Sequence, residues 1–123
     1  MRAHIVHPDP SSEFYTPERC FILESWNTPE DEGLSLARAR VQPGVTTALH
    51  ALRATVERYL ILSGSGIVEV DTLPPTTVTA GDIVVIPAGK PQRVTNNGET
   101  DLVFYAICTP RFRGSAYQAL EPQ

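Results

Sequence analysis

An all-β sandwich or barrel is the fold class that the sequence predicts, and three observations support it. Eleven prolines and eight glycines are spread along the chain as punctuation between short segments. These segments are rich in β-branched and aromatic residues, which is typical of strands. No segment has the apolar spacing of a long amphipathic helix. Many short strands joined by turns are therefore expected.

Length and charge narrow the class of protein further. A chain of 123 residues can bury a hydrophobic core of its own, so residues 1–123 are expected to form one domain. The formal net charge is −4 and no basic cluster is present, which argues against a nucleic-acid partner. The chain has no apolar run of about 18 residues and no signal-peptide pattern at its start, so we expect a cytoplasmic protein without a membrane partner.

The elements are expected to divide the chain into three parts. Residues 1–19 are predicted to be an irregular N-terminal arm, because their prolines prevent a long helix. Residues 20–108 are predicted to form the barrel, and residues 109–123 a polar tail with one short helix near 115–120. Leu34–Val41 alternates between apolar and polar positions, as a half-buried strand does. The predicted strands are 20–24, 34–41, a strand bearing His50, 57–62, 67–70, 78–80, 83–86, 92–95 and 102–108.

Two apolar strands carry further expectations. Ile83–Ile86 is β-branched throughout and is predicted to be covered on both faces. Leu102–Cys108 is apolar on both faces, which predicts that one face packs in the barrel and the other on a second subunit of a homodimer. Residues 110–113, just beyond it, are expected to cover the barrel mouth or the edge of the dimer. Cys20 and Cys108 are expected to be buried reduced thiols rather than a disulfide.

A histidine and a glutamate on adjacent predicted strands form the candidate site. His50 shares a strand face with Leu52, and Glu57 shares one with Tyr59 and Ile61. An imidazole and a carboxylate on paired strands can converge on one interior point. Such convergence is one way for a β-barrel to build a metal site.

Two blocks of sequence resemble the motifs of the cupin family. Gly44, His50, Glu57 and Gly64 follow the first motif, G-x5-H-x-H-x3,4-E-x6-G. The second motif, G-x5-P-x-G-x2-H-x3-N, is matched in order by Gly81, Pro87, Gly89 and Asn96. The resemblance covers about the central half of the chain. It implies a jelly-roll β-barrel, often dimeric, with a metal and substrate site inside.

Two positions depart from the family pattern. Leu52 stands where the first motif has its second histidine, and Gln92 stands where the second motif has its histidine. The resemblance therefore implies a reduced ligand set of His50, Glu57 and Gln92. These residues could hold Fe, Mn, Ni or Zn loosely, since an amide oxygen is a weak donor and leucine has no lone pair.

A site without metal is the alternative reading of the same residues. His50, Glu57 and Gln92 would then form a hydrogen-bonded cluster, with Glu57 accepting from one of the other two. In either case strand alternation adds four residues to the substrate pocket. These are Leu52, Tyr59, Ile61 and Val94.

Three functions remain open from the sequence. The first is a metal-dependent enzyme of dioxygenase, isomerase or lyase type that acts on a small oxygenated metabolite, with Glu57 and His50 as catalytic residues. The second is a small-molecule-binding or sensor protein that has lost its metal. The third is a metal-free isomerase in which Glu57 and His50 transfer protons. Fold alone does not separate these functions.

Overall fold

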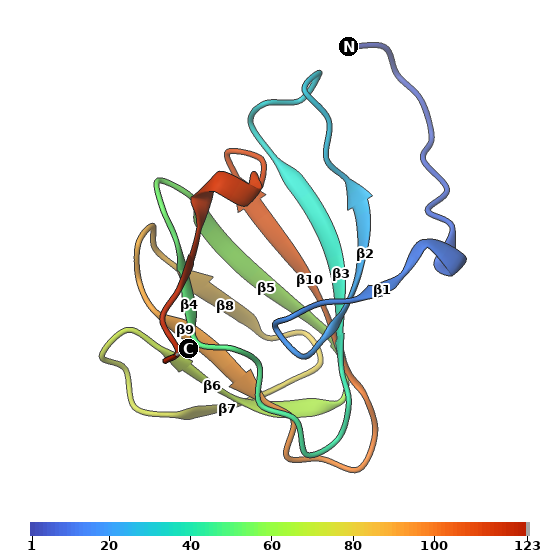
Figure 1. The fold of residues 1–123 in the computed structure, drawn as a ribbon. Helices are drawn as coiled ribbons and strands as arrows, with labels where there is room; N and C mark the ends of the chain where they lie inside the picture. Colours follow the sequence, from blue (N-terminus) through green and yellow to red (C-terminus); the bar gives the residue numbers. More distant parts are fainter. Residues whose placement is uncertain (123) are drawn as a thin grey trace.

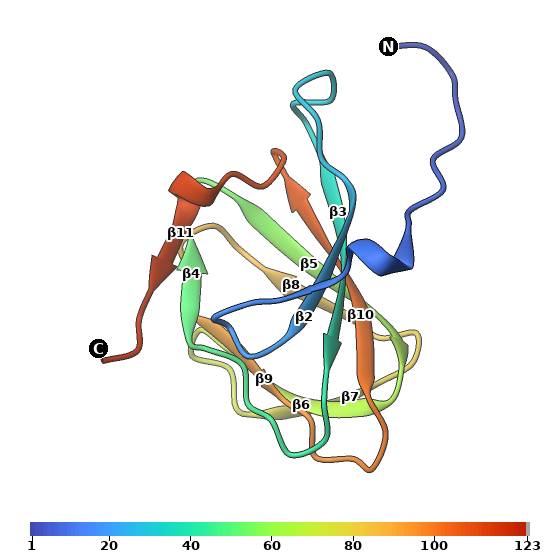
Figure 2. The same cartoon turned by 45° about the vertical axis from the view of Figure 1, so that its right-hand side comes forward.

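The computed structural model describes residues 1–122 and contains two antiparallel sheets that face each other (Figures 1 and 2). No helix in this part of the chain is long and apolar enough to span a membrane. In spatial order the first sheet is β1 (Phe14–Tyr15), β2 (Phe21–Trp26), β3 (Ser35–Val41), β10 (Leu102–Thr109), β5 (Val56–Ser63) and β8 (Ile83–Ile86). The second is β11 (Tyr117–Ala119), β4 (His50–Leu52), β9 (Gln92–Thr95), β6 (Ser65–Val70) and β7 (Thr76–Thr79). Two single-turn 3₁₀ helices are η1 (Pro10–Ser12) and η2 (Gly114–Ala116).

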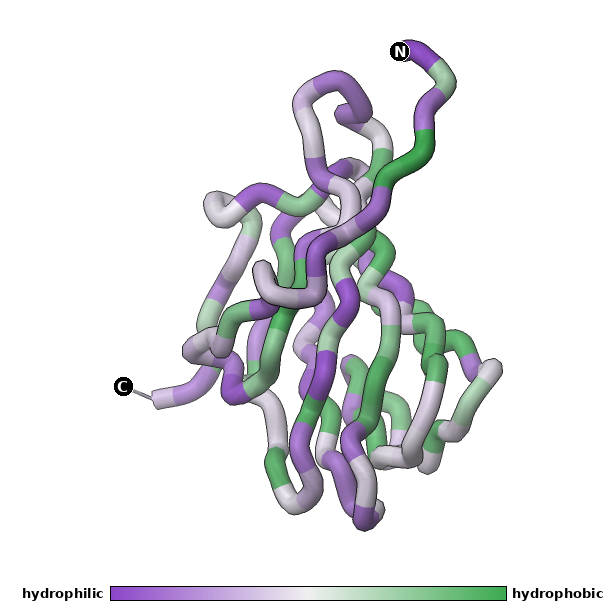
Figure 3. The backbone as a smooth tube through the Cα atoms, turned by 90° about the vertical axis from the view of Figure 1, so that its right-hand side faces the viewer, coloured by the Kyte–Doolittle hydropathy of each residue, from purple (hydrophilic) through white to green (hydrophobic). Residues whose placement is uncertain are grey.

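Alternation along the strands places the core between the sheets. In β5 the inward residues Glu57, Tyr59 and Ile61 are buried, and the residues between them are only half-buried. Figure 3 shows the same alternation of hydrophobic and hydrophilic residues along the extended segments. The all-β, jelly-roll class expected from the sequence is confirmed. The core cluster comprises Cys20, Ala39, Val41, Tyr59, Ile61, Val68, Val70, Val78, Val84, Ile86, Val94, Leu102 and Phe104.

The register brings the candidate residues to the same level of the barrel. His50 of β4 lies directly opposite Gln92 of β9, in the five-stranded sheet. Glu57 of β5 lies opposite Cys108 of β10, in the other sheet. The first motif therefore supplies one residue to each sheet, because the chain crosses between the sheets in the loop between β4 and β5 (Figure 2).

Two local expectations at the ends of the chain differ from the structure. The N-terminal segment contains η1 and the short strand β1 as well as irregular chain. The tail holds only a 3₁₀ turn before it extends into β11, which adds to the edge of the second sheet beside β4. Residues 117–119 of the tail are thus stabilised by backbone pairing with β4, which the sequence pattern does not predict.

β8 was expected to be covered on both faces, and this expectation is wrong for a single copy of the chain. β8 lies at the edge of the first sheet, where Ile83 is 64% exposed and Val85 is 58% exposed. Only the alternate residues Val84 and Ile86 face the core. The homodimer stays a prediction.

Gly64, the last glycine of the first motif, is expected to be intolerant of a side chain. Its φ is +81°, and an added Cβ would lie 2.5 Å from the Asp101 carbonyl oxygen and 3.0 Å from Leu102 Cα. Gly44 has a similar φ of +80° but open space around it, so Gly44→Ala measures backbone strain alone, about 1–2 kcal/mol. Gly64→Ala should cost about 1–3 kcal/mol more in urea unfolding, because backbone must move. Equal costs for the two variants would contradict this expectation.

Candidate active site

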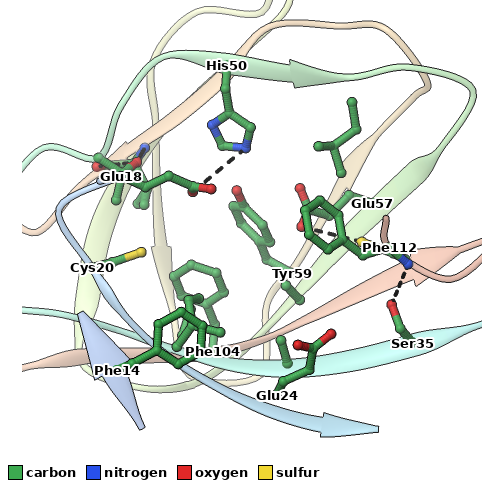
Figure 4. Close-up of a pocket in the computed structure, with 18 residues that line it drawn as sticks. Phe14, Glu18, Cys20, Glu24, Ser35, His50, Glu57, Tyr59, Phe104 and Phe112 are labelled. Atoms are coloured by element: carbon green, nitrogen blue, oxygen red, sulfur yellow. Dashed lines mark hydrogen bonds and ion pairs between the residues drawn. The ribbon is translucent and has the colours of Figure 1, made fainter. Parts of the chain in front are cut away.

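A cavity of about 160 Å³ lies between the two sheets (Figure 4). It is lined by alternate residues of strands on both sides, with aromatic and aliphatic walls and a group of polar side chains. Phe112 is anchored at the cavity by its backbone N–H, which donates to Ser35 Oγ at 2.8 Å. The expectation that residues 110–113 cover the barrel mouth or the edge of a dimer stays a prediction. The lining residues are Phe14, Glu18, Cys20, Ile22, Glu24, Ser35, Ala37, Ala39, Thr47, His50, Leu52, Glu57, Tyr59, Val94, Phe104, Ala106, Cys108 and Phe112.

His50 presents one ring nitrogen to this cavity. The side chain is buried, and Nδ1 lies 2.9 Å from the Ala48 carbonyl oxygen, to which it donates. This bond fixes the tautomer of a neutral ring and leaves the lone pair of Nε2 free to accept. Tyr117 of β11 stacks on the other side of the imidazole, with ring centroids 5.0 Å apart. The orientation of His50 is therefore set by both its backbone contact and the C-terminal strand.

Glu57, Gln92 and Tyr59 form a buried chain of hydrogen bonds. Gln92 Nε2 donates to Glu57 Oε1 at 2.7 Å, and the Tyr59 hydroxyl donates to Gln92 Oε1. Burial raises the pKa of the Glu57 carboxyl, and the bond from Gln92 lowers it by less. Burial also raises the pKa of Tyr59 well above its ordinary value, so the phenol stays protonated as a donor. The other carboxyl oxygen of Glu57 lies 3.7 Å from the Cys108 thiol.

Glu18 is a second carboxyl at the cavity. Its Oε2 lies 4.0 Å from His50 Nε2, which is beyond hydrogen-bond distance, and the two groups form an ion pair only when the imidazole is protonated (Figure 4). Burial raises the pKa of Glu18, and the nearby imidazole lowers it by a smaller amount. Burial thus raises the pKa of both Glu18 and Glu57.

The neighbouring residue Arg19 holds Glu18 in position. Arg19 adopts a left-handed φ of +68°, and its side chain donates to the Thr46 carbonyl at 2.8 Å and to Glu121 at 2.7 Å. The Glu18 carbonyl accepts from the Ala48 N–H at 3.1 Å. The N-terminal arm, the loop before β4 and the C-terminal tail therefore meet beside His50.

Both cysteines are free and line the cavity, as the sequence predicts for buried thiols. Burial raises the pKa of Cys20 to about 11, and it raises that of Cys108 further. At neutral pH both remain thiols. They are poor nucleophiles and poor metal ligands in this state.

The residues predicted for the site fall into three groups. His50, Glu57, Leu52, Tyr59 and Val94 line the cavity. Gln92 is almost fully buried behind the cavity wall, where it supports Glu57. Ile61 does not line the cavity and belongs to the hydrophobic core, so its assignment to the pocket is corrected. Ile61 lies two residues beyond Tyr59 on β5, and Tyr59 is the last residue of that strand to line the cavity.

The proposed metal ligands do not form an open donor set in this arrangement. The Gln92 oxygen is occupied by the Tyr59 hydroxyl, and its NH₂ group faces Glu57. Leu52 supplies only hydrocarbon. Within residues 1–122, no three His, Cys, Asp or Glu side chains are grouped closely enough to hold a metal ion. The residues fit a hydrogen-bonded acid–base site better than the ligand set that the resemblance implies.

Glu18 is the main site residue that sequence reasoning missed. Assigning the first nineteen residues to an arm excluded it from the barrel. The signal was present, because Glu18, Cys20, Ile22 and Glu24 follow the period of a strand and all line the cavity. Phe14, Phe104 and Cys108 were equally not assigned to the pocket.

This fold and cavity define a class: small antiparallel β-barrels with a pocket of small-molecule size between their sheets. The family model of the Cupin domain matches residues 37–108, and the chain belongs to this family. The chain is 34% identical over 71 residues to an oxalate-binding protein of Thermotoga maritima. The matched part covers 58% of this chain and 58% of that protein. It is 32% identical over 87 residues to the uncharacterized protein MJ1618 of Methanocaldococcus jannaschii, covering 71% of this chain and 69% of the relative.

A solved structure extends the likeness to almost the whole chain. A PAC13 variant from Streptomyces with uridine superposes with a TM-score of 0.80, covering 98% of this chain and 92% of that one. The two are only 13% identical, so this similarity establishes the fold alone.

Proposed function

We propose that this protein acts on a small oxygenated molecule by acid–base chemistry of the isomerase or epimerase type, without a metal ion. His50 and Glu57 are the proton-transfer groups. The observation that supports this most is the orientation of Gln92, whose amide joins Tyr59 to Glu57 instead of facing the cavity.

Each group has a defined part in the reaction. Glu57 takes a proton from a carbon or hydroxyl of the substrate, and its buried carboxyl, with a raised pKa, is a stronger base than an exposed one. Gln92 keeps Glu57 in place through its N–H donor. Glu57 then returns this proton to a neighbouring atom of the substrate. His50 Nε2 accepts the proton of a substrate hydroxyl and gives it to the substrate oxygen that becomes the new hydroxyl, while Nδ1 stays bound to Ala48. Two groups on facing sheets can thus move protons on opposite sides of one substrate.

A metal-dependent enzyme is the second candidate, and the orientation of His50 favours it. A ring whose Nδ1–H is held by a backbone carbonyl while Nε2 faces a cavity is the usual arrangement of a metal-binding imidazole. Glu57 and Glu18 would have to move closer to His50 to become the further ligands, because the three side chains are not grouped closely enough in this arrangement. A bound divalent ion would supply Lewis-acid chemistry at a substrate oxygen. Gln92→His should tighten metal binding if residue 92 turns toward such an ion.

Deuterium exchange tests the proposal without knowledge of the substrate. Protein stripped of metal by a chelator is incubated in D₂O with a mixture of hydroxy- and keto-metabolites, and the products are analysed by mass spectrometry. We expect deuterium to enter at least one compound, and His50→Gln and Glu57→Gln to abolish this entry. Exchange that requires an added divalent ion would replace the proposal with the metal-dependent candidate. Ligand binding without any exchange would favour the non-catalytic binding protein.

A further inference from the structure

We infer that the cavity selects ligands that donate hydrogen bonds, such as hydroxyl, N–H or ammonium groups on a compact body, and rejects small carboxylates. This inference deepens the proposed function, because it concerns the ligand of the same site. It rests on the hydrogen-bonding character and the charge of the cavity wall.

The polar groups that reach the cavity are mainly acceptors. His50 is about 96% buried, and its Nε2 has no hydrogen-bond partner within residues 1–122. Because Nδ1 donates to Ala48, Nε2 can only accept. Glu57 and Glu18 add carboxyl oxygens on either side, and Glu24 lies further along the same wall. Figure 4 shows the Glu18 and Glu57 carboxyl groups and the imidazole around one common space, with Glu24 at the far end of the cavity.

Two hydroxyl donors of the wall are already engaged. The Tyr59 hydroxyl donates to Gln92, and the Thr47 hydroxyl donates to the Val94 carbonyl at 3.3 Å. The Cys108 thiol lies against Glu57. No lining residue is lysine or arginine. A bound carboxylate would therefore meet two or more acidic side chains without a cation, which costs free energy on desolvation.

Size and wall chemistry restrict the body of the ligand. The cavity of about 160 Å³ is close to the cavity of about 150 Å³ that accommodates a benzene ring. Tyr59 and Phe104 form one aromatic wall with ring centroids 4.3 Å apart, and Phe14 and Phe112 also line the space. A single six-membered ring or a short chain with two or more donors fits both the space and the acceptors.

Matched single-ring probes test the inference on metal-free protein. Resorcinol carries two neutral donors, benzylamine carries an ammonium, and benzoate presents only acceptors. Binding is measured by calorimetry and thermal shift at millimolar probe concentration, with oxalate as a second anion. We expect resorcinol or benzylamine to bind at least about tenfold more tightly than benzoate or oxalate. The better of the two donor probes then tells whether the native group is a hydroxyl or an ammonium.

Two variants connect this selectivity to the cavity. Glu18→Gln replaces an acceptor with an amide that can donate. The ratio of the benzoate Kd to the resorcinol Kd should therefore become smaller. Glu69→Gln removes the same charge outside the cavity, where Glu69 pairs with Arg93, and should leave this ratio of Kd values unchanged. Benzoate or oxalate binding as tightly as the donor probes, or no binding of either donor probe, would overturn the inference. Donor selectivity without deuterium exchange would remove only the proposed reaction, and exchange in a carboxylate-binding pocket would remove only this inference.

Discussion

Glu57→Gln is expected to lower the rate of deuterium exchange by about 10²–10⁴-fold while the barrel stays folded. The amide retains an oxygen that can accept the bond from Gln92 Nε2, so the hydrogen-bonded chain survives. What is lost is the capacity to take up and release a proton. The exchange assay gives the rate, and circular dichroism gives the fold. Glu69→Gln is the matched control, since Glu69 pairs with Arg93 outside the cavity.

The same substitution should change the pH dependence of stability. Burial raises the pKa of Glu57 above its ordinary value of 4.5, so the folded state binds the proton more tightly than the unfolded state. The stability that this protonated carboxyl contributes is fully present below pH 4.5 and is lost as the pH rises through the folded-state pKa. Glutamine has no such proton. The Tm of Glu57→Gln relative to the natural chain should therefore increase from pH 4.5 to pH 8, and a constant or falling difference would contradict the assignment.

The sequence predicts most of the fold because local signals and the fold agree. Gly64 and Gly81 lie in turns with positive φ, where the motif requires glycine. Asn96 is fully buried and donates to the Val41 and Thr100 carbonyls, both at 2.8 Å. These residues are read directly from their spacing. The exposure of Ile83 and Val85 cannot be predicted from the sequence, because an apolar strand can have the same sequence at an edge as in the middle of a sheet.

The site is less predictable than the fold for two physical reasons. Glu18 lies near His50 beside Arg19, which adopts a left-handed conformation and binds Glu121, a contact between residues far apart in sequence. Gln92 has two ends, and sequence cannot tell whether the oxygen or the nitrogen faces Glu57. The position of Tyr59 decides this, since its hydroxyl donates to the amide oxygen and turns the NH₂ group to the carboxyl.

Gln92→Leu is expected to be the most destabilising conservative change in the site, by about 2–5 kcal/mol in urea unfolding. The side chain is only 1% exposed, so leucine fills a similar space without providing a donor or an acceptor. Glu57 loses its donor and Tyr59 loses its acceptor, and each unsatisfied buried group costs about 1–3 kcal/mol. Because the bond from Gln92 lowers the pKa of Glu57, its loss should also raise that pKa further.

A double-mutant cycle separates the hydrogen-bonded chain from simple packing. Tyr59→Phe alone leaves the Gln92 oxygen without its donor, whereas Tyr59→Phe in the Gln92→Leu background removes a hydroxyl that has already lost its acceptor. Tyr59→Phe should therefore lower the free energy of unfolding less in the Gln92→Leu background than in the natural chain. The difference, which is the coupling free energy, should be about 0.5–3 kcal/mol. If the two substitutions add to within about 0.5 kcal/mol, the Tyr59–Gln92 bond contributes nothing. The orientation of the amide, on which the acid–base site depends, would then have no energetic basis.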